Sequence, residues 1–224
     1  MSHLISELSY LSEIFIEMLE LVKKQLEKST FSLLNNDVDL AEEIVRTEQR
    51  VNASEINVEK ECENIIALFQ PVATDLRFVI AILKSVSELE RIGDHAEFVA
   101  NCILDKQEPF DAELMKLFSV EKIHTLVIQM YDHIIEAFET KNSERARKVF
   151  KIDKEINKLY KQSIKDMKTE LGNQNPKAPE ILTIYAINAR FERNGDLLTN
   201  IAEEIIFYID AEMLKHKKKK KETK

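Results

Sequence analysis

Apolar residues recur every three or four positions along nearly the whole chain, the spacing of one face of an amphipathic helix. The first such stretch begins at Leu4 and stops at residues 35–37, where Asp37 is a good N-cap for a second helix. We expect this second helix to end near Pro71 and a third to begin just after it. Residues 105–111, which include a proline, interrupt the pattern.

The second half of the chain repeats this organisation. The pattern predicts a fourth helix over about residues 111–140 and a fifth that begins at Asn142-Ser143. The fifth ends at the sequence Gly-Asn-Gln-Asn-Pro of residues 172–176, and a sixth runs from Pro179 to about Leu214. Six helices of about 30 residues would each be about 45 Å long, so we expect an elongated bundle.

Composition supports an all-α fold. The 224 residues include 3 Gly and 4 Pro, whereas average usage would give roughly 15 and 11. Hairpins and phosphate-binding loops need these residues, which argues against β-sandwiches, barrels and Rossmann-type folds. The two cysteines, Cys62 and Cys102, are expected to be free thiols in a reducing compartment. No apolar run approaches the length of a membrane helix, and the N-terminus does not resemble a signal peptide, so we expect a soluble, cytoplasmic protein.

Charge is distributed unevenly along the chain. Residues 215–224 hold seven Lys and one Glu, which leaves 25 basic and 39 acidic residues in 1–214, a net charge of −14. An acidic body argues against nucleic acid as the main partner. The Lys-rich tail is most simply a solvated, disordered end, and attraction to anionic lipid or to an acidic partner is the alternative.

A short motif occurs twice and reveals a tandem duplication. The sequence Glu90-Arg-Ile-Gly-Asp94 returns 102 residues later as Glu192-Arg-Asn-Gly-Asp196. In the preceding helix of each half, Glu48 to Asn52 is matched by Asp153 to Asn157, 105 residues later. The chain therefore consists of two pseudo-symmetric three-helix bundles in tandem, residues 1–107 and 108–214, followed by the tail 215–224.

The repeated motif suggests a cation site in each half. Acids four residues apart share a helix face and repel each other unless a cation lies between them. A glycine inside a helix costs about 1 kcal/mol relative to alanine, yet Gly93 and Gly195 each precede the second acid. Something must therefore approach the backbone there, either a neighbouring helix or a bound ion. If the second and third helices of each half pack antiparallel, the paired acids face the acid and the asparagine of the preceding helix.

The resulting ligand set in each half is three carboxylates and one amide oxygen. Its members are Glu48, Asn52, Glu90 and Asp94 in the first half and Asp153, Asn157, Glu192 and Asp196 in the second. Oxygen ligands suit Mg²⁺, Mn²⁺ or iron, and suit Zn²⁺ poorly without His or Cys. The alternative is that these acids form salt bridges on a solvated face with Arg50, Arg91, Arg190 or Arg193.

Other candidate residues are weaker. Glu121 and His124 match the Glu-x-x-His element of di-iron bundles, but no second copy exists, so a core or solvated histidine is favoured. His95 follows Asp94 and would point away from it. Arg77 lies in the first turns of the third helix, where it could meet a partner or an anion. No nucleophile arrangement or Gly-rich loop is present in the sequence, which disfavours an enzyme.

Several of these stretches together resemble the PhoU family of phosphate-signalling regulators. They are Gln70–Arg77, Glu88–Asp94, Ala189–Asp196, Asn200–Glu203, and Asp39–Ala41 leading to Val51-Asn52. The resemblance covers about residues 3–210. It implies two adjacent three-helix bundles, commonly dimeric, in a non-enzymatic cytoplasmic protein. It also implies negative control of the phosphate-starvation response through contacts with a sensor histidine kinase and with the ATPase of the phosphate ABC transporter.

The resemblance further implies metal sites. Some members of the family bind iron or zinc clusters, and others bind Mg²⁺ or Mn²⁺, through motifs that match the eight residues given above. Asn52 and Asn157 depart from the fullest carboxylate pattern, which should weaken the binding of a highly charged cluster. We expect Arg77, Arg91 and Arg193 to contribute to partner binding. Two alternative functions are an accessory domain of a sodium–phosphate cotransporter and a carboxylate-bridged metal enzyme.

Overall fold

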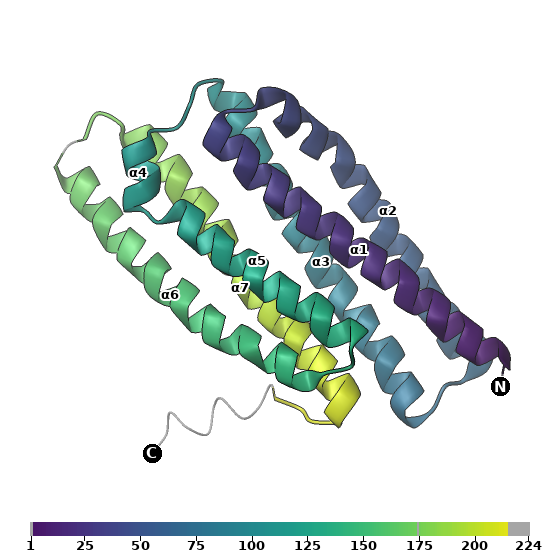
Figure 1. The fold of residues 1–224 in the computed structure, drawn as a ribbon. Coiled ribbons are helices and arrows are strands. Elements are labelled where there is room, and N and C mark those ends of the chain that lie inside the picture. The colour runs from purple at the N-terminus through teal and green to yellow at the C-terminus, as the bar shows by residue number, and fades with distance from the viewer. Residues whose placement is uncertain (1, 174, 215–224) are drawn as a thin grey trace, which may run out of the picture.

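The computed structural model describes residues 2–173 and 175–214, and every regular element in this part of the chain is an α-helix. The seven described helices are α1 (Ser2–Asn35), α2 (Val38–Phe69), α3 (Ala73–Lys106), α4 (Ala112–Leu117), α5 (Val120–Glu139), α6 (Ser143–Gly172) and α7 (Ala178–Asp210). They form an elongated bundle (Figure 1). The predicted all-α fold is confirmed, and the Lys-rich tail lies outside the described residues.

The predicted caps account for where two of the helices begin. The Asp37 carboxylate accepts a hydrogen bond from the Leu40 backbone N–H at 3.0 Å, which starts α2. The Asn142 side chain accepts one from the Glu144 N–H at 3.0 Å, which starts α6. α2 ends where Gln70 adopts a left-handed conformation directly before Pro71.

Two of the predicted boundaries are wrong. The expected fourth helix is divided into α4 and α5, because the chain turns at Phe118 and at Ser119, whose φ of 58° lies in the left-handed region. The apolar periodicity continues across this turn, so the break left no trace in the pattern. The last helix ends at Asp210 and not near Leu214, since Ala211 adopts φ 57°.

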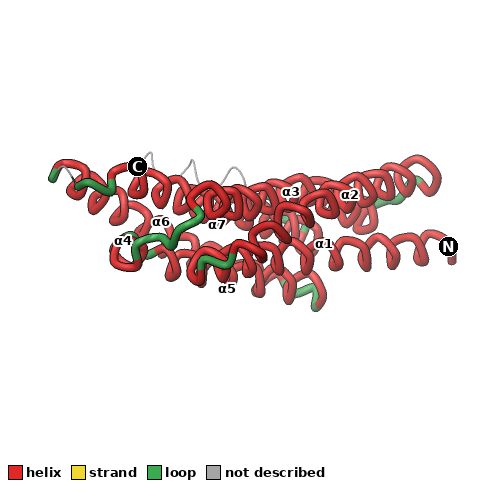
Figure 2. The backbone as a smooth tube through the Cα atoms, turned by 90° about the horizontal axis from the view of Figure 1, so that it is seen from above, coloured by secondary structure: helices red, strands yellow, loops and turns green. Residues whose placement is uncertain are grey.

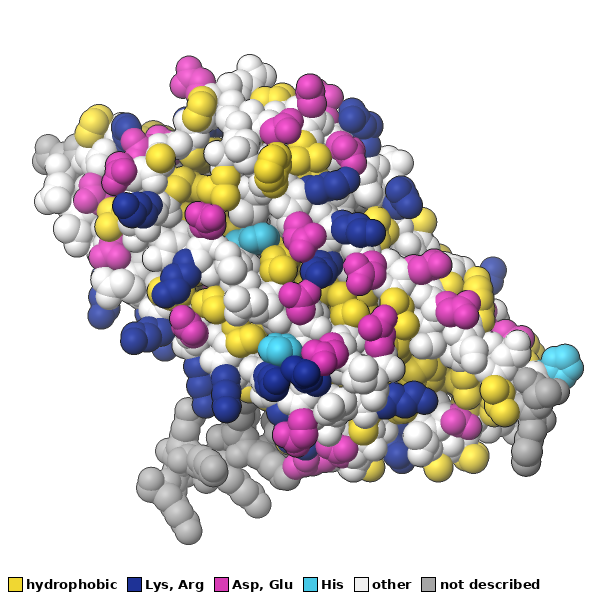
Figure 3. Space-filling model, in the orientation of Figure 1, with side chains coloured by type: hydrophobic (Ala, Val, Ile, Leu, Met, Phe, Trp, Pro, Cys, Tyr) yellow, Lys and Arg dark blue, Asp and Glu magenta, His cyan; other side chains and the backbone are white. Residues whose placement is uncertain are grey.

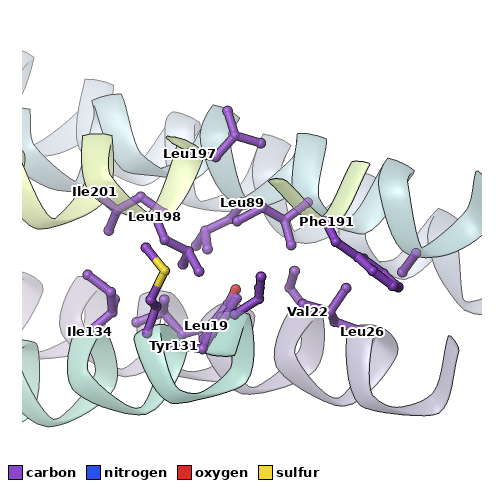
Figure 4. Close-up of a cluster of buried hydrophobic side chains, with 14 of the residues drawn as sticks. Leu19, Val22, Leu26, Leu89, Tyr131, Ile134, Phe191, Leu197, Leu198 and Ile201 are labelled. Carbon is purple, nitrogen blue, oxygen red and sulfur yellow. The ribbon is translucent and has the colours of Figure 1, made fainter. Parts of the chain in front are cut away.

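The helices form two groups of three that pack in two layers. α1, α2 and α3 pack on one another, as do α5, α6 and α7. Seen from above, α2, α3, α7 and α6 form one layer, and α1 and α5 lie in the other (Figure 2). Buried side chains of α1 and α5 meet those of α3 and α7 in one continuous apolar core (Figure 4).

α3 and α7 form the main interface between the two groups and run antiparallel. In four of the side-chain pairs that join them, the residue number rises on α3 as it falls on α7. The pairs are Lys84–Glu204 at 3.3 Å, Glu88–Asn200 at 3.1 Å, His95–Asn194 at 2.5 Å, and Phe98 beneath the Arg190 guanidinium at 3.8 Å. At an offset of 102, Glu88 corresponds to Arg190 and Phe98 to Asn200, so a pseudo-two-fold axis passes through this interface.

The boundary that we propose between the two repeats falls in the connection from α3 to α4, after residue 107. Among the described residues, no helix has the length and apolar character needed to cross a membrane.

Candidate functional site

The first acidic motif lies where α2 and α3 pack tightly against each other. A Cβ atom on Gly93 would lie 3.0 Å from Cγ1 of Val51 and 3.1 Å from Oε2 of Glu48. α2 therefore approaches the α3 backbone so closely that only a glycine fits without movement of the neighbours. The predicted close approach at this glycine is confirmed, and the approaching group is the α2 helix itself.

Glu48 is a buried carboxylate without a hydrogen-bond partner in the described part of the chain. Its side chain is 5% exposed, and neither oxygen accepts a hydrogen bond from a described residue. Burial is the largest cause that raises its pKa, to about 7, and the negative charges of Asp94, Glu97 and Glu90 add to it. A carboxylate in this setting needs either a proton or a cation.

Glu55 joins this group, although it lies outside the repeated motif. Burial raises its pKa, and so do the charges of Glu90, Glu59 and Asp94. Glu55 is seven residues after Glu48, two turns along the same face of α2, and this heptad spacing was visible in the sequence. Asn52, which we expected in this position, lies instead on the exposed side of α2.

We call Glu48, Glu55, Glu90, Asp94 and Glu97 the first-half carboxylate cluster. Burial and the charge of Asp94 raise the pKa of Glu90, and Arg91 lowers it. Among the described residues, Arg91 is the one basic side chain that affects the pKa of Glu48, Glu55 or Glu90. The cluster therefore carries an excess of negative charge around the buried Glu48.

The second acidic motif is packed more loosely. A Cβ atom on Gly195 would lie 3.5 Å from Cδ1 of Ile156 and 3.7 Å from Oδ1 of Asp153, both ordinary contact distances. The Asn157 amide donates a hydrogen bond to Asp153 Oδ2 at 3.1 Å. The structure thus brings Asp153 and Asn157 together and places Asp153 beside the glycine.

Basic side chains of the protein compensate the second motif. Burial, followed by the charges of Asp196 and Asp153, raises the pKa of Glu192, whereas Arg193 and Lys161 lower it. Arg193 also pairs with Asp196, with a distance of 3.1 Å from Nη1 to Oδ2. The Arg193–Asp196 pair is a salt bridge of the kind that we considered as the alternative to a cation site. In the first half, the residue that corresponds to Lys161 is the apolar Ile56.

The three arginines expected to meet partners lie in different settings. Arg77 is half-buried and donates to the Tyr208 carbonyl at 3.4 Å and to Thr74 Oγ1 at 3.1 Å, so it joins α3 to the end of α7. The Arg91 side chain is 60% exposed, with Nη1 3.7 Å from a Glu88 oxygen. That of Arg193 is 53% exposed and pairs with Asp196. Of the three arginines, Arg91 has the most exposed side chain for contact with a partner.

The remaining candidates have structural roles. His124 is a core histidine whose Nε2 lies 3.0 Å from the Leu26 carbonyl oxygen, and burial lowers its pKa to about 4. His95 contacts Asn194 across the α3–α7 interface. Both cysteines are free thiols, as expected: Cys62 is buried and Cys102 half-buried.

The described residues meet only part of what a metal site requires. No group of three or more His, Cys, Asp and Glu side chains within residues 2–173 and 175–214 converges as ligands of one ion. The first-half carboxylate cluster nevertheless fits a hard cation, because Glu48 keeps two buried oxygens without partners inside an excess of negative charge. The second motif fits a cation less well, since Arg193 pairs with Asp196 and, with Lys161, lowers the pKa of Glu192.

Comparison with known proteins identifies relatives that match most of the chain. The sequence model of the PhoU domain matches residues 15–103 and again residues 120–205. A phosphate-specific transport system accessory protein PhoU of Edwardsiella tarda is 33% identical over 211 residues, which cover 94% of this chain and 86% of that protein.

Two solved structures have the same fold. The crystal structure of PhoU from Pseudomonas aeruginosa superposes with a TM-score of 0.85 at 31% identity and covers 92% of this chain and 99% of its own. The phosphate transport system regulatory protein PhoU from Streptococcus pneumoniae gives a TM-score of 0.84 at 26% identity, with 94% and 99% covered.

Proposed function

The chain belongs to the PhoU family of phosphate transport accessory and regulatory proteins, which are not enzymes, and from this premise we propose that it restrains phosphate-starvation signalling in the cytoplasm. It does so as a dimer, by contact with a sensor histidine kinase and with the ATPase of the phosphate ABC transporter. The observation that supports this proposal is the family match to both repeats, at 33% identity to a relative over 94% of the chain.

The structure supports a role based on contact. The helices present long, charged surfaces around one continuous core, and the exposed Arg91 lies beside the first-half carboxylate cluster. Any change in the charge of that cluster would alter the field at Arg91. We infer that a cation bound at the cluster changes the charge of the surface that a partner contacts.

A cation is the second part of the proposal. Glu48, Glu90 and Asp94 would hold a metal such as Mg²⁺, Mn²⁺, iron or Zn²⁺ in the first half, with Glu55 close by. The ion would give the Glu48 carboxylate a positively charged partner, and would hold α2 and α3 together. Oxygen ligands alone favour Mg²⁺, Mn²⁺ or iron over Zn²⁺. The second motif would bind an ion more weakly, because Lys161 and Arg193 compete with it.

Gene deletion tests the regulatory role. In the organism that encodes this protein, loss of the gene should leave phosphate-starvation genes expressed in phosphate-rich medium, and the intact gene should restore repression. Arg91→Ala should weaken that repression without loss of protein, whereas Arg50→Ala, on the exposed side of α2, serves as the matched control. Normal repression in the deletion strain would count decisively against the regulatory proposal.

Elemental analysis of purified protein tests the cation. We expect Glu90→Ala with Asp94→Ala to abolish bound metal, and Glu192→Ala with Asp196→Ala to leave most of it. Equal metal content in the first variant and the wild type would exclude the first-half site. This readout does not depend on signalling, so the two halves of the proposal can fail separately.

A further inference from the structure

One face of α6 carries a regular row of lysines. Successive members are three or four residues apart, the spacing that keeps side chains on one side of a helix. They are Lys151, Lys154, Lys158, Lys161, Lys165 and Lys168, which we call the α6 lysine stripe. All six are exposed, and the stripe is about 26 Å long at 1.5 Å per residue. α6 forms one outer edge of the bundle, where Lys and Arg side chains recur in Figure 3.

The stripe carries net charge. Within the described part of the chain, none of the six ammonium groups lies within 4.0 Å of a carboxylate oxygen. The acids on the same stretch of α6 have other partners. Asp153 accepts from Asn157, Glu155 pairs with Lys122 of α5, Asp166 accepts from Gln162, and Glu170 accepts from Asn175.

The fold does not require these lysines. α2 is the counterpart of α6 in the first repeat, and at an offset of 105 the matching residues are Arg46, Gln49, Ala53, Ile56, Lys60 and Glu63. α2 therefore packs in the same way with mixed residues on that face. Six lysines aligned on one helix of a chain with net charge −8 are a property of the second repeat alone.

The last described residues lie near the start of this stripe. Arg147, one turn before Lys151, pairs with Asp210 at 3.1 Å and with Glu212 at 2.6 Å. The described chain thus ends beside the N-terminal end of α6, and ten further residues with seven Lys follow Leu214. The seven tail lysines therefore follow, in the sequence, a point near the start of the stripe.

We propose that the α6 lysine stripe is a docking surface for an anionic lipid membrane, with the tail adding to the attraction. A linear array of lysines without interleaved aromatic residues suits a surface of many equivalent phosphate groups. Protein interfaces are depleted in Lys and enriched in aromatic residues and Arg, none of which the stripe contains. The stripe also offers no aromatic platform for bases, as single-stranded nucleic acid would need. The remaining surface is acidic, so electrostatics would orient the protein with α6 towards the lipid.

Vesicle co-sedimentation of the full chain tests this proposal. Binding is expected to vesicles of phosphatidylcholine with about 30% phosphatidylglycerol, but not to phosphatidylcholine alone, and to disappear between about 0.05 M and 0.5 M salt. Each lysine near an anionic surface contributes about fivefold, so Lys158→Gln with Lys165→Gln should lower the partition coefficient about 25-fold.

Matched variants separate the stripe from general charge effects. Lys24→Gln with Lys60→Gln removes the same charge from exposed positions on α1 and α2 and should change binding less than about twofold. Lys218→Gln with Lys219→Gln should weaken vesicle binding, and the stripe substitutions should weaken it further when they are added to this variant. Thermal unfolding and helical content, which all three variants should preserve, verify the fold.

Four results would overturn the proposal. The first is no binding to anionic vesicles, and the second is an equal loss of vesicle binding in the stripe and control variants. The third is a loss of vesicle binding in the tail variant with none in the stripe variant, and the fourth is tighter stripe-dependent binding to duplex DNA or to a poly-glutamate peptide than to vesicles. The last result would identify a different polyanion as the partner of α6.

Discussion

Alanine at the two motif glycines should have opposite effects on stability. Inside a helix, alanine is favoured over glycine by about 1 kcal/mol. At Gly195 the added methyl meets its neighbours at 3.5 Å and 3.7 Å, so we expect Gly195→Ala to stabilise the protein by up to about 1 kcal/mol.

At Gly93 the same methyl has no room. It would lie 3.0 Å from Val51 and 3.1 Å from Glu48, both of them buried. A valine in a helix has one strongly preferred rotamer, which opposes the movement that the methyl requires, and overpacking costs about 1 to 3 kcal/mol. After the helix-propensity gain, we expect Gly93→Ala to destabilise the protein by up to about 2 kcal/mol.

Chemical and thermal unfolding of the two variants would measure this difference. For a chain of this size, 1 kcal/mol corresponds to about 2–4 °C in Tm, so Gly195→Ala should melt above the wild type and Gly93→Ala below it. Urea midpoints at unchanged slope would give the same order. Equal shifts in the two variants, or stabilisation by both, would refute the claim that α2 and α3 need a glycine at this contact.

Three further predictions concern buried groups and a strained turn. In metal-free protein, Glu48→Gln should stabilise the fold by about 2 to 3 kcal/mol at pH 8 and little at pH 4, because the wild-type pKa of about 7 against an ordinary 4.5 makes wild-type stability fall as pH rises through that interval. Urea unfolding across pH 4–8 would show this, and a parallel pH profile in the variant would contradict it. Ser119→Gly should stabilise by about 1 kcal/mol, measured as a higher Tm, because φ is 58° there. Asn188→Ala should cost about 1 to 3 kcal/mol in urea unfolding, because the buried Asn188 amide donates to the Phe118 carbonyl at 2.8 Å; a loss below 0.5 kcal/mol would show that this bond does not secure the α4–α5 turn.

The sequence was most informative where one physical cause dominates. Caps such as Asp37 and Asn142 act within a single turn, so their sequence context predicts the start of a helix. The helix break at Ser119 was not predictable in this way. At this break the Asn188 amide, 70 positions away, donates a hydrogen bond to the Phe118 carbonyl, and a local pattern contains no information about such a contact.

The candidate site was predicted in part for a similar reason. A repeated glycine next to a repeated acid indicated a close contact, and Glu48 lies at that contact. Which residues share the space was harder to predict. Glu55 belongs to the group and Asn52 does not, because the face that α2 turns towards α3 depends on how the two helices pack, and a search limited to four-residue spacing cannot reveal it.

The two repeats show which features the duplicated fold needs and which it leaves free. Both have a glycine, Gly93 or Gly195, where the second helix of the repeat packs against the third. A small residue there lets the two helices pack closely around the core. Their charges have diverged in opposite directions. The first repeat surrounds the buried Glu48, which has no hydrogen-bond partner among the described residues, with acids. The second repeat has Lys161 at the position of Ile56, and Lys161 and Arg193 lower the pKa of Glu192. A basic side chain there belongs to the α6 lysine stripe as well, so the same substitution that weakens a cation site adds to a basic surface. The two proposed roles, ion binding in the first repeat and attachment through the second, therefore follow from a single asymmetry in charge.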